Sequence, residues 1–553
     1  MFAPETKSER DIFELWKDLR PDDAFAQGID ECAGRFFIPT PTRVKKALAR
    51  IAKLRKAAQD LPARKILASF RARLEFPEPA HLPESLLEAF FAHMMKEDVR
   101  PKDMQSLALD GRKALDTSRD QARRDSPPGK RALVQLACNG LAEILKTVEG
   151  QLVEEKPRQA IRALEAANRR YAKRFDLPGF RPEATFDEVY AFFQQKGCGL
   201  GRSRYYARAL RDLWDYEETP AQVEAAGLRM MRREMPHFQA LVRRFAEELK
   251  CEPTAEAVDR KLKERRGLRP NQILAFLNGI RDHAMRVADK YIVAINPEYT
   301  TQIIETPPYL VNVTPSGAAY GLDTLTDHSR EIFLATTDER SAARPPPGEL
   351  LNLLVHEEYG HCVHGSNSAH AFAGRPRLLD LINSTFVCVS EGIAFQRELE
   401  FLPVIQEIAA GKLSGEAENA FADALEAWGG IAAVSREYEF LTYFWRIIRF
   451  LRVIGDARIN VGKQDLVHFI EWAHRTTGLQ RSSIYYQLFP AHQVIGPGYA
   501  STYAIIGERI RGLQQEAMKR GTSLRDFNAY ASSIGWPPKS IFEAKLETWV
   551  RSH

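Results

Sequence analysis

Cysteine is scarce in this 553-residue sequence, which has only six, and none of them is closely spaced with another. The scattered positions exclude a disulfide framework and a zinc site made of cysteine pairs. The first 20 residues are charged from Glu5 onward and lack the apolar core of a signal peptide. These absences predict a protein of a reducing compartment, and we expect a cytoplasmic location.

A long uninterrupted hydrophobic run is also missing. The most apolar stretch, FLTYFWRIIRFLRVIG, is broken by Arg446, Arg449 and Arg452, whose spacing of three makes a polar stripe on a helix and excludes a membrane span. Charge of one sign is not in large excess, because 78 lysines and arginines stand against 73 aspartates and glutamates, a net charge of +5. The sequence therefore predicts neither nucleic acid nor a membrane as a partner.

Helical periodicity dominates what is present. Amphipathic stretches are separated by proline and glycine at EFPEPAHLPES, RDSPPGKR and FDLPGFRPEATFDE. At one start signal, Thr219 can cap a helix, Pro220 takes its first position and Gln222 completes a capping box. We predict a mainly α fold with an N-terminal helical region at 1–200, a second helical region at 201–297 and a final lobe at 298–553.

Between about residues 298 and 338, β-branched and aromatic residues divided by turn residues predict two to four short strands. The segment RPPPGELLNLLVHEEYGHCVHGS follows directly. Its proline run, Glu349 in the first turn and apolar body predict a helix that stops at Gly365.

That helix carries LVHEEYGHCVHG at 354–365. Zinc hydrolases commonly have H-E-x-x-H on a helix, because residues four apart share a face and can hold one ion. Here His356 and His361 are five apart, so on a regular α-helix they point about 140° away from each other. A π-type bulge removes this offset, and such bulges concentrate at functional sites.

Two other interpretations of the motif stay open. On an undistorted helix, Glu357, His361 and His364 share one face and form an alternative ligand set. The segment is also compatible with a plain polar surface helix without metal.

Two downstream segments could complete a metal site. In FVCVSEGIAFQRELEFL, Glu391 lies 30 residues after His361 and precedes Gly392, which lets another backbone come close. Glu398 and Glu400 are expected to be solvated. In QLFPAHQVIGPGYASTYAIIGERIRGL, the residues able to stabilise an oxyanion, or alternatively to pack in the core, are His492, Tyr499 and Tyr503.

These segments resemble known metallopeptidases. HEEYGHCVHG resembles HEFGHALHG of the thimet-oligopeptidase-like enzymes with one added residue, and GPGYASTYAIIGE resembles their Gly-Tyr-x-x-x-Tyr segment. More distantly, the chain resembles carboxypeptidase-Taq-like enzymes. Over roughly residues 200–515 the chain resembles an uncharacterised bacterial family of metallopeptidase-like proteins with an H-E-x-x-P-G-H-H motif. It is carried, in order, by TPAQVEAAGLRMMRREM, IETPPYL, PPPGELLNLLVHEEYGH, SEGIAFQRELE, RIIRFLRVIGDARIN and GPGYASTYAIIGERIRGLQ.

The resemblance implies a large helical zincin-type (gluzincin) fold. A small antiparallel sheet would lie beside the active-site helix, a deep channel would separate two helical lobes, and 298–553 would be the catalytic lobe. One zinc ion per chain would be bound by His356, His361 and Glu391. Glu357 would be the general base, with transition-state stabilisation from Tyr499, Tyr503 and His492. The missing proline of the motif and Asn460, where a histidine is expected, leave the substrate open.

The sequence thus predicts a zinc metallopeptidase that cleaves short peptides as an oligopeptidase or carboxypeptidase. One alternative is a metal hydrolase of a non-peptide amide or a modified amino acid. Another is a non-catalytic helical binding protein that uses the basic segment at 43–65 on nucleic acid, although its alanine and leucine spacing is typical of a solvated amphipathic helix. The sequence makes no prediction of the oligomeric state.

Overall fold

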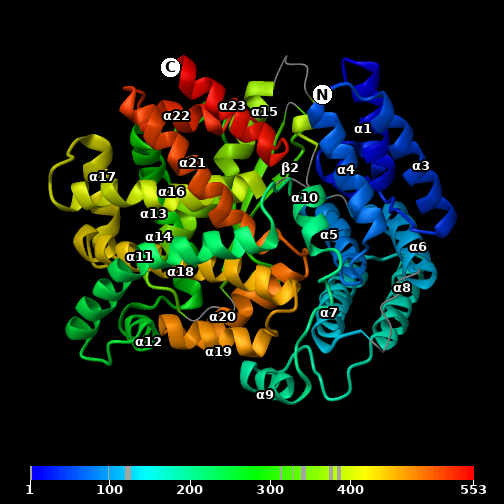
Figure 1. Cartoon of the computed structure of the whole chain (residues 1–553), viewed down its shortest axis with the longest axis horizontal. Coiled ribbons are helices and arrows are strands. Elements are labelled where there is room, and N and C mark those ends of the chain that lie inside the picture. Colours follow the sequence, from blue (N-terminus) through cyan, green and yellow to red (C-terminus); the bar gives the residue numbers. More distant parts are fainter. Residues whose placement is uncertain are drawn as a thin grey trace.

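The computed structural model describes residues 3–97, 99–118, 126–311, 314, 316–326, 328–337, 344–372, 378–382 and 388–553. Helices account for most of these residues (Figure 1), which confirms the predicted mainly α fold. In all three views the first eight helices gather on one side of the molecule, away from the helices that follow residue 220.

The N-terminal part consists of α1 (Lys7–Leu19), α2 (Pro21–Ala26), η1 (Asp30–Cys32), α3 (Pro41–Ala57), α4 (Leu61–Glu75), α5 (His81–Met95), α6 (Pro101–Thr117), α7 (Pro128–Gln151), α8 (Glu155–Arg174), α9 (Phe186–Lys196) and α10 (Tyr206–Leu213). Helix α3 buries only Ala47 and Ile51. Its lysines lie on the exposed surface, so the predicted amphipathic helix is confirmed, and the absence of a nucleic-acid partner stays a prediction.

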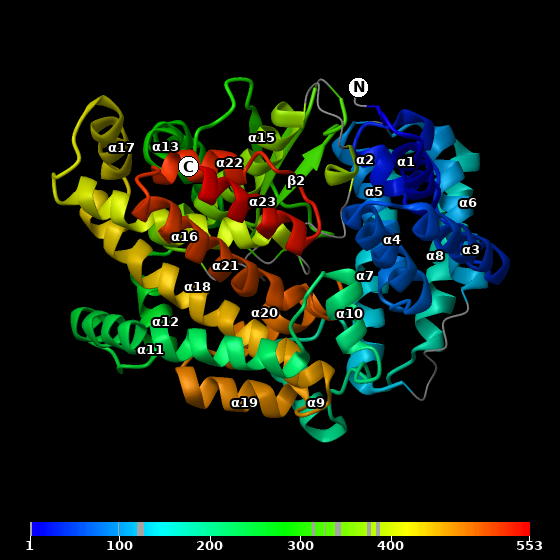
Figure 2. The same ribbon diagram turned by 45° about the horizontal axis from the view of Figure 1, so that its top comes forward.

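The helices before the sheet are α11 (Pro220–Leu249), α12 (Ala255–Arg266) and α13 (Pro270–Tyr291). Those after it are α14 (Pro347–Leu354), η2 (Val355–Cys362), α15 (Val363–Phe372), η3 (Leu378–Asp380), α16 (Cys388–Ala409), α17 (Glu416–Glu426), α18 (Ile431–Asn460), α19 (Leu466–Thr477), α20 (Arg481–Leu488), η5 (Phe489–Gln493), α21 (Tyr499–Lys519), α22 (Leu524–Ala531) and α23 (Lys539–Ser552). Helix α11 starts as predicted, with a capping box between Thr219 and Gln222. Helices α11, α16, α18 and α21 pack side by side (Figure 2).

One buried hydrophobic cluster extends from Ile12 in α1 to Val550 in α23. A second cluster lies between α13, α14 and α17 and includes Tyr359 of the motif. The region boundaries at residues 200 and 297 stay predictions. A cavity of about 420 Å³ beside α12 and α13 is lined by none of the predicted site residues, and the deep channel between two lobes also stays a prediction.

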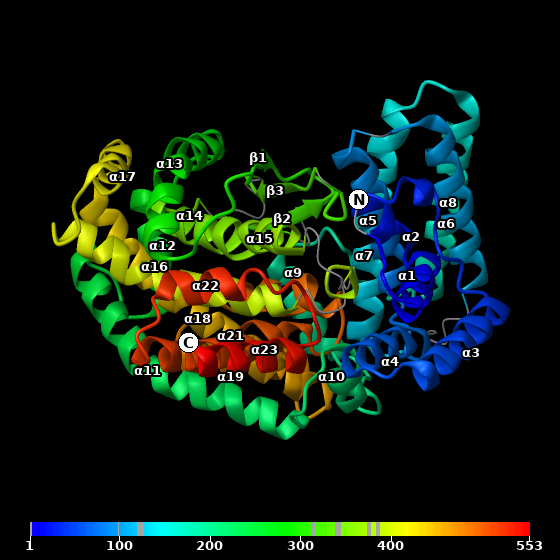
Figure 3. The ribbon, with the colours of Figure 1, turned by 90° about the horizontal axis from the view of Figure 1, so that it is seen from above.

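The sheet lies beside α14 and α15 (Figure 3) and contains β1 (Thr301–Glu305), β2 (Gly317–Leu322) and β3 (Arg330–Ala335) in the order β1-β3-β2. Strand β2 is antiparallel to β3, but β1 is parallel to it. The expected antiparallel sheet is therefore wrong, and the sheet is mixed. The short connection between β2 and β3 makes that pair antiparallel, whereas a long connection that includes β2 separates β1 from β3 and permits their parallel pairing.

The motif helix differs from its prediction at one end. Instead of stopping at Gly365, the helix continues through α15 to Phe372. Gly365 lies in its interior, where a Cβ would collide with the carboxylate of Glu331 on β3. The glycine thus serves the close approach of helix and sheet, and it is not a terminator.

Candidate metal centre

The structure brings His356, His361 and Glu391 together, as the sequence predicts. Each offers one ligand atom, and these atoms lie within 4.8 Å of one another. The carboxylate Oε2 of Glu391 is 3.3 Å from Nε2 of His361 and 3.8 Å from Nε2 of His356. In the part of the chain that the structure describes, this is the one group of three such residues close enough to hold a metal ion.

The two histidines converge because the helix is widened between them. Segment η2 is a π-helix, and at its end the N–H of Val363 donates to the carbonyl of Glu358, five residues earlier. The imidazole rings of His356 and His361 have centroids 5.0 Å apart and planes at 82°. The predicted bulge is confirmed, since i to i+5 hydrogen bonding places residues five apart on one face.

Glycines allow the third residue to reach this pair. A Cβ at Gly360 would overlap Ala394 of α16, so α16 can press against η2 only while residue 360 lacks a side chain. One residue after Glu391, a Cβ at Gly392 would collide with Ile506 of α21. The expectation that Gly392 admits a neighbouring backbone is therefore confirmed.

Gly360→Ala should separate α16 from η2 and lower the free energy of unfolding by about 1–3 kcal/mol, the usual range for overpacking. Gly512→Ala is the matched control on α21, because nothing lies within 4 Å of the position of its Cβ. That control should leave stability unchanged or raise it by up to about 1 kcal/mol. Urea unfolding followed by circular dichroism compares the two, and equal effects would contradict the close packing at Gly360.

The second nitrogen of each histidine already has a partner. His356 Nδ1 lies 2.6 Å from Glu398 Oε1, and His361 Nδ1 lies 2.8 Å from the hydroxyl of Ser390. Arg449 forms an ion pair of 2.6 Å with the same Glu398. Such partners fix the orientation of metal-binding imidazoles in proteins, and here they leave both Nε2 atoms facing Glu391.

The expectation that Glu398 and Glu400 are solvated is wrong. The first is fully buried and the second is 7% exposed. Glu400 forms an ion pair of 2.7 Å with Arg397, one turn earlier on α16. Arg397 is a local partner within the same segment, whereas Arg449, the partner of Glu398, lies 51 residues later and is outside the local sequence pattern.

The carboxylates of the cluster favour a positive charge at His356, and this imidazole must give up its proton to bind a metal. Burial alone would lower the pKa of His356, but Glu391 and Glu398 raise it to about 9. Burial would raise the pKa of Glu391, but the facing imidazoles hold it well below its usual range. Within the described residues, the buried Oε2 of Glu391 accepts no hydrogen bond. Two imidazole nitrogens and one carboxylate oxygen are a ligand set that fits zinc with a fourth position for water.

The alternative ligand set with His364 is not assembled. His364 is fully buried, its Nδ1 lies 3.0 Å from Ser390 Oγ, and its Nε2 lies 3.1 Å from the carbonyl oxygen of Gly535. Burial lowers the pKa of His364 to about 3. This histidine is a neutral packing residue that links α15 to the segment before α23.

The two glutamates of the motif have different surroundings. Glu358 is fully buried and receives hydrogen bonds from Arg281 at 2.7 Å and from Tyr299 at 3.1 Å. Glu357 is 6% exposed, and we find no hydrogen bond or ion pair between it and another described residue. A general base needs an oxygen that water can reach, so Glu357 fits that role and Glu358 does not.

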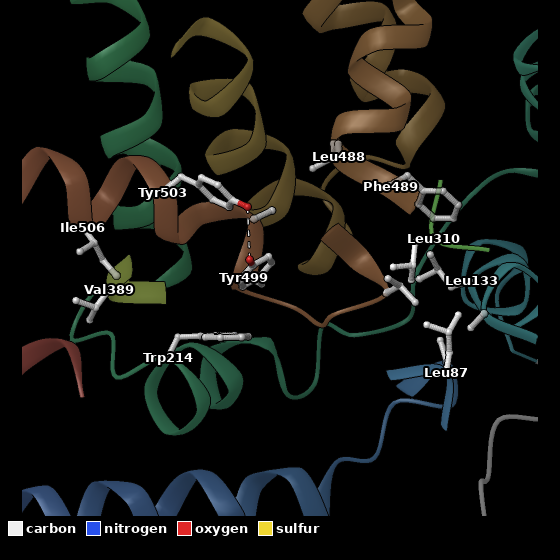
Figure 4. Close-up of a cluster of buried hydrophobic side chains, with 14 of the residues drawn as sticks. Leu87, Leu133, Trp214, Leu310, Val389, Leu488, Phe489, Tyr499, Tyr503 and Ile506 are labelled. Carbon is white, nitrogen blue, oxygen red and sulfur yellow. Dashed lines mark hydrogen bonds between the residues drawn. The ribbon is translucent and has the colours of Figure 1, made fainter. Parts of the chain in front are cut away.

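The predicted tyrosines lie at the same centre. The hydroxyl of Tyr499 donates to Glu391, and it lies 3.4 Å from the hydroxyl of Tyr503. His492 Nε2 is also 3.4 Å from the Tyr503 hydroxyl. Figure 4 shows the two hydroxyls pointing toward one another, with Trp214 packed against Tyr499 at a ring distance of 5.4 Å.

The protonation states of these groups follow from burial. Burial and the charge of Glu391 raise the pKa of the Tyr499 and Tyr503 hydroxyls well above the usual range, so both stay protonated donors. Burial and the nearby Arg452 lower the pKa of His492 well below its usual range, so its ring is neutral.

The sequence did not predict the local structure of the His492 segment or the buried hydrogen bonds that fix it. It forms a second π-helix, η5, whose Gln493 accepts a hydrogen bond of 2.7 Å from the fully buried Arg202. Arg202 also forms an ion pair of 2.8 Å with Glu78, before α5. Asn460, which departs from the resembled family, donates to Asp456 at 2.8 Å and closes this network.

The arginine stripe predicted on a helix lies on α18, and its three side chains are buried. Arg446 and Arg449 have buried carboxylate partners, whereas Arg452 donates to the amide oxygen of Gln487. Burial lowers the pKa of Arg452 to about 10. The spacing of three in the sequence predicts that the arginines share one face of the helix. Whether that face is buried depends on elements that are far away in the chain.

Comparison with known proteins shows the fold alone. No family model and no curated protein matches this chain. It is similar to a solved structure described as a "putative lipoprotein" from Colwellia psychrerythraea, with a TM-score of 0.66 and 14% identity over 99% of this chain and 100% of that one. A second structure, described as a "putative lipoprotein of unknown function" from Shewanella oneidensis, has a TM-score of 0.65 and 15% identity over 98% of both chains.

These descriptions contradict the expected cytoplasmic location, because a lipoprotein is held at a membrane by its lipid. The cytoplasmic location is therefore not retained. Among the helices that the structure describes, none is both long enough and apolar enough to cross a bilayer.

Proposed function

We propose that this protein is a zinc-dependent hydrolase that cleaves amide bonds of short peptides. The observation that carries the proposal is the meeting of His356, His361 and Glu391 across a π-helix. Glu357, next to the first histidine, is 6% exposed and has no hydrogen bond or ion pair with a described residue. The resemblance to zincin metallopeptidases supports the same function. Strand β2, an edge of the described sheet and adjacent to η2, offers main-chain groups for an extended peptide.

The residues divide the chemistry among them. His356, His361 and Glu391 hold the ion, which when bound lowers the pKa of water to about 7 and polarises a carbonyl. Glu357 removes a proton from the attacking water and passes it to the leaving amine. Tyr503 donates a hydrogen bond to the carbonyl oxygen as negative charge develops on it, and Tyr499 can do so when its hydroxyl turns away from Glu391.

The direct test incubates purified, zinc-supplemented protein with a mixed library of short unstructured peptides and detects products by mass spectrometry. Cleavage that a chelator abolishes and zinc restores supports the proposal. Bound zinc without cleavage of any peptide would contradict the peptidase function and leave hydrolysis of a non-peptide amide. Absence of stoichiometric metal would favour a non-catalytic binding protein.

Tyr499→Phe and Tyr503→Phe should both retain metal, and at least one should lower kcat by roughly 10²-fold, the effect of losing one oxyanion donor. Tyr486→Phe is the control, because Tyr486 is 40% exposed and is absent from the candidate centre. Steady-state kinetics on one cleaved peptide measures all three variants. Unchanged kcat in both site variants would remove the tyrosines from catalysis.

A further inference from the structure

The arginines of α18 differ in how their charges are balanced. Arg446 is fully buried and forms an ion pair of 2.6 Å with Glu234. Arg449, one turn later, forms its ion pair of 2.6 Å with Glu398. Each of these two guanidinium groups therefore has a buried carboxylate partner, as buried charges in proteins normally do.

Arg452 has no such partner. It is 5% exposed, and it forms no ion pair with a carboxylate anywhere in the described ranges. Its hydrogen bond goes to the neutral amide of Gln487. Its buried Nε donates to no described group, which also holds for one nitrogen each of Arg446 and Arg449, so the missing carboxylate partner is what distinguishes Arg452. The charge of Glu391 acts on this guanidinium from beyond ion-pair distance, so Arg452 keeps the capacity to bind an anion in direct contact.

The position of Arg452 limits where that anion binds. Its Cζ lies 4.9 Å from the ring centre of Tyr503. The Tyr503 ring is stacked at 6.2 Å from the imidazole of His356, and its hydroxyl is 3.4 Å from His492. One side chain therefore separates Arg452 from the candidate metal centre.

We propose that Arg452 binds the C-terminal carboxylate of the substrate, so that the protein releases single C-terminal residues. The inference rests on the proposed hydrolase function. In the last residue of a peptide the carboxylate is two bonds from the scissile nitrogen, so a cation beside the reacting centre recognises it. The planar guanidinium matches a carboxylate in two parallel hydrogen bonds. Hydrolysis breaks the last amide C–N bond, and water supplies hydroxyl to the acyl carbon and a proton to the amine.

The kinetic test uses two peptides of one sequence, one ending in a free carboxylate and the other in a carboxamide. The parent should cleave the free acid with a kcat/KM about 10- to 100-fold higher, the size of a charge-assisted hydrogen bond. Arg452→Gln should lower kcat/KM for the acid by that factor and leave the amide unchanged, while Arg452→Lys keeps part of the preference. Arg436→Gln is the control, because this arginine of α18 is 54% exposed at its side chain.

A binding test does not depend on metal or turnover. Titration calorimetry of the metal-free protein with N-acetyl-phenylalanine and with its amide should show tighter binding of the acid by the parent, and no difference for Arg452→Gln. Circular dichroism verifies folding. If Arg452→Gln does not fold, the affinities of the parent and of Arg452→Lys for the acid and the amide test the proposal, and equal affinities of the parent for both compounds would overturn it.

Three results separate the two proposals. Equal kcat/KM of the parent for acid and amide would overturn the role of Arg452 while leaving the hydrolase function intact. An equal loss on both peptides in Arg452→Gln would also overturn it, and would assign Arg452 to the orientation of Tyr503. No cleavage of either peptide contradicts the proposed function, and calorimetry then decides whether Arg452 binds carboxylates.

Discussion

Glu357→Gln is expected to keep the fold and the metal content of the protein and to lower kcat for peptide cleavage by at least about 10²- to 10⁴-fold. The amide is nearly the same size as the carboxylate but cannot accept the proton of water, so the variant loses the general base. Glu357 forms no hydrogen bond or ion pair with other described residues, and its replacement by the similarly sized glutamine therefore breaks no described polar bond. Single-turnover kinetics together with metal analysis of the same sample measures both effects.

Glu358→Gln provides the matched control on the next residue. This change removes the charge paired with Arg281 in a fully buried position, so it should lower stability by roughly 3–5 kcal/mol. The fraction that stays folded should turn over at the parent rate. If Glu358→Gln abolishes kcat and Glu357→Gln does not, the roles of the two glutamates are reversed and the proposed base is wrong.

The second large effect concerns the metal. The parent should bind about one zinc ion per chain, and His356→Ala or Glu391→Ala should remove it, because a site with three protein ligands loses one of them. His364→Ala should retain the ion, since both nitrogens of His364 are occupied by Ser390 and by the backbone of Gly535. Elemental analysis after dialysis against a defined zinc buffer measures the content.

A smaller loss of zinc affinity is expected when a residue that contacts a metal ligand, and not the ligand itself, is changed. Glu398→Gln should weaken zinc affinity by about 10- to 100-fold without abolishing it, because Glu398 orients His356 and is not one of the three ligands. The change also removes the charge paired with Arg449. Glu407→Gln, at an exposed position of the same helix, is its control. Metal loss in His364→Ala together with retention in His356→Ala would show that the alternative ligand set is the true one.

Local chemistry explains what the sequence could predict. The spacing of His356 and His361 is incompatible with one face of an α-helix, so the π-helix followed from the assumption that both bind one ion. Glu391 could be chosen because Gly392 allows close packing of the helix that carries it. Tyr499 and Tyr503 are four apart on one helix, and their shared face needs no long-range information.

Long-range contacts explain the features of the fold and the site that the sequence could not predict. The local pattern predicts that Glu398 is a surface charge, because its buried partner Arg449 lies 51 residues later in the chain. The pairing of β1 with β3 joins strands about 30 residues apart in the chain. The buried contact of Arg202 with Glu78 joins residues 124 positions apart. None of these partners lies within the local window from which a periodicity is read.

The π-helical segment also sets which face of the following helix, α15, is turned toward its neighbours. One added residue turns the next helix by about 100° about its axis. Helix α15 uses that rotation, since His364 contacts the carbonyl of Gly535 and Ser368 donates to the carbonyl of Ser532. Deleting one residue between the two histidines would return their spacing to four and still let them face one ion, but it would rotate α15 away from residues 532–535. The length of the motif is thus matched to a segment about 170 residues later.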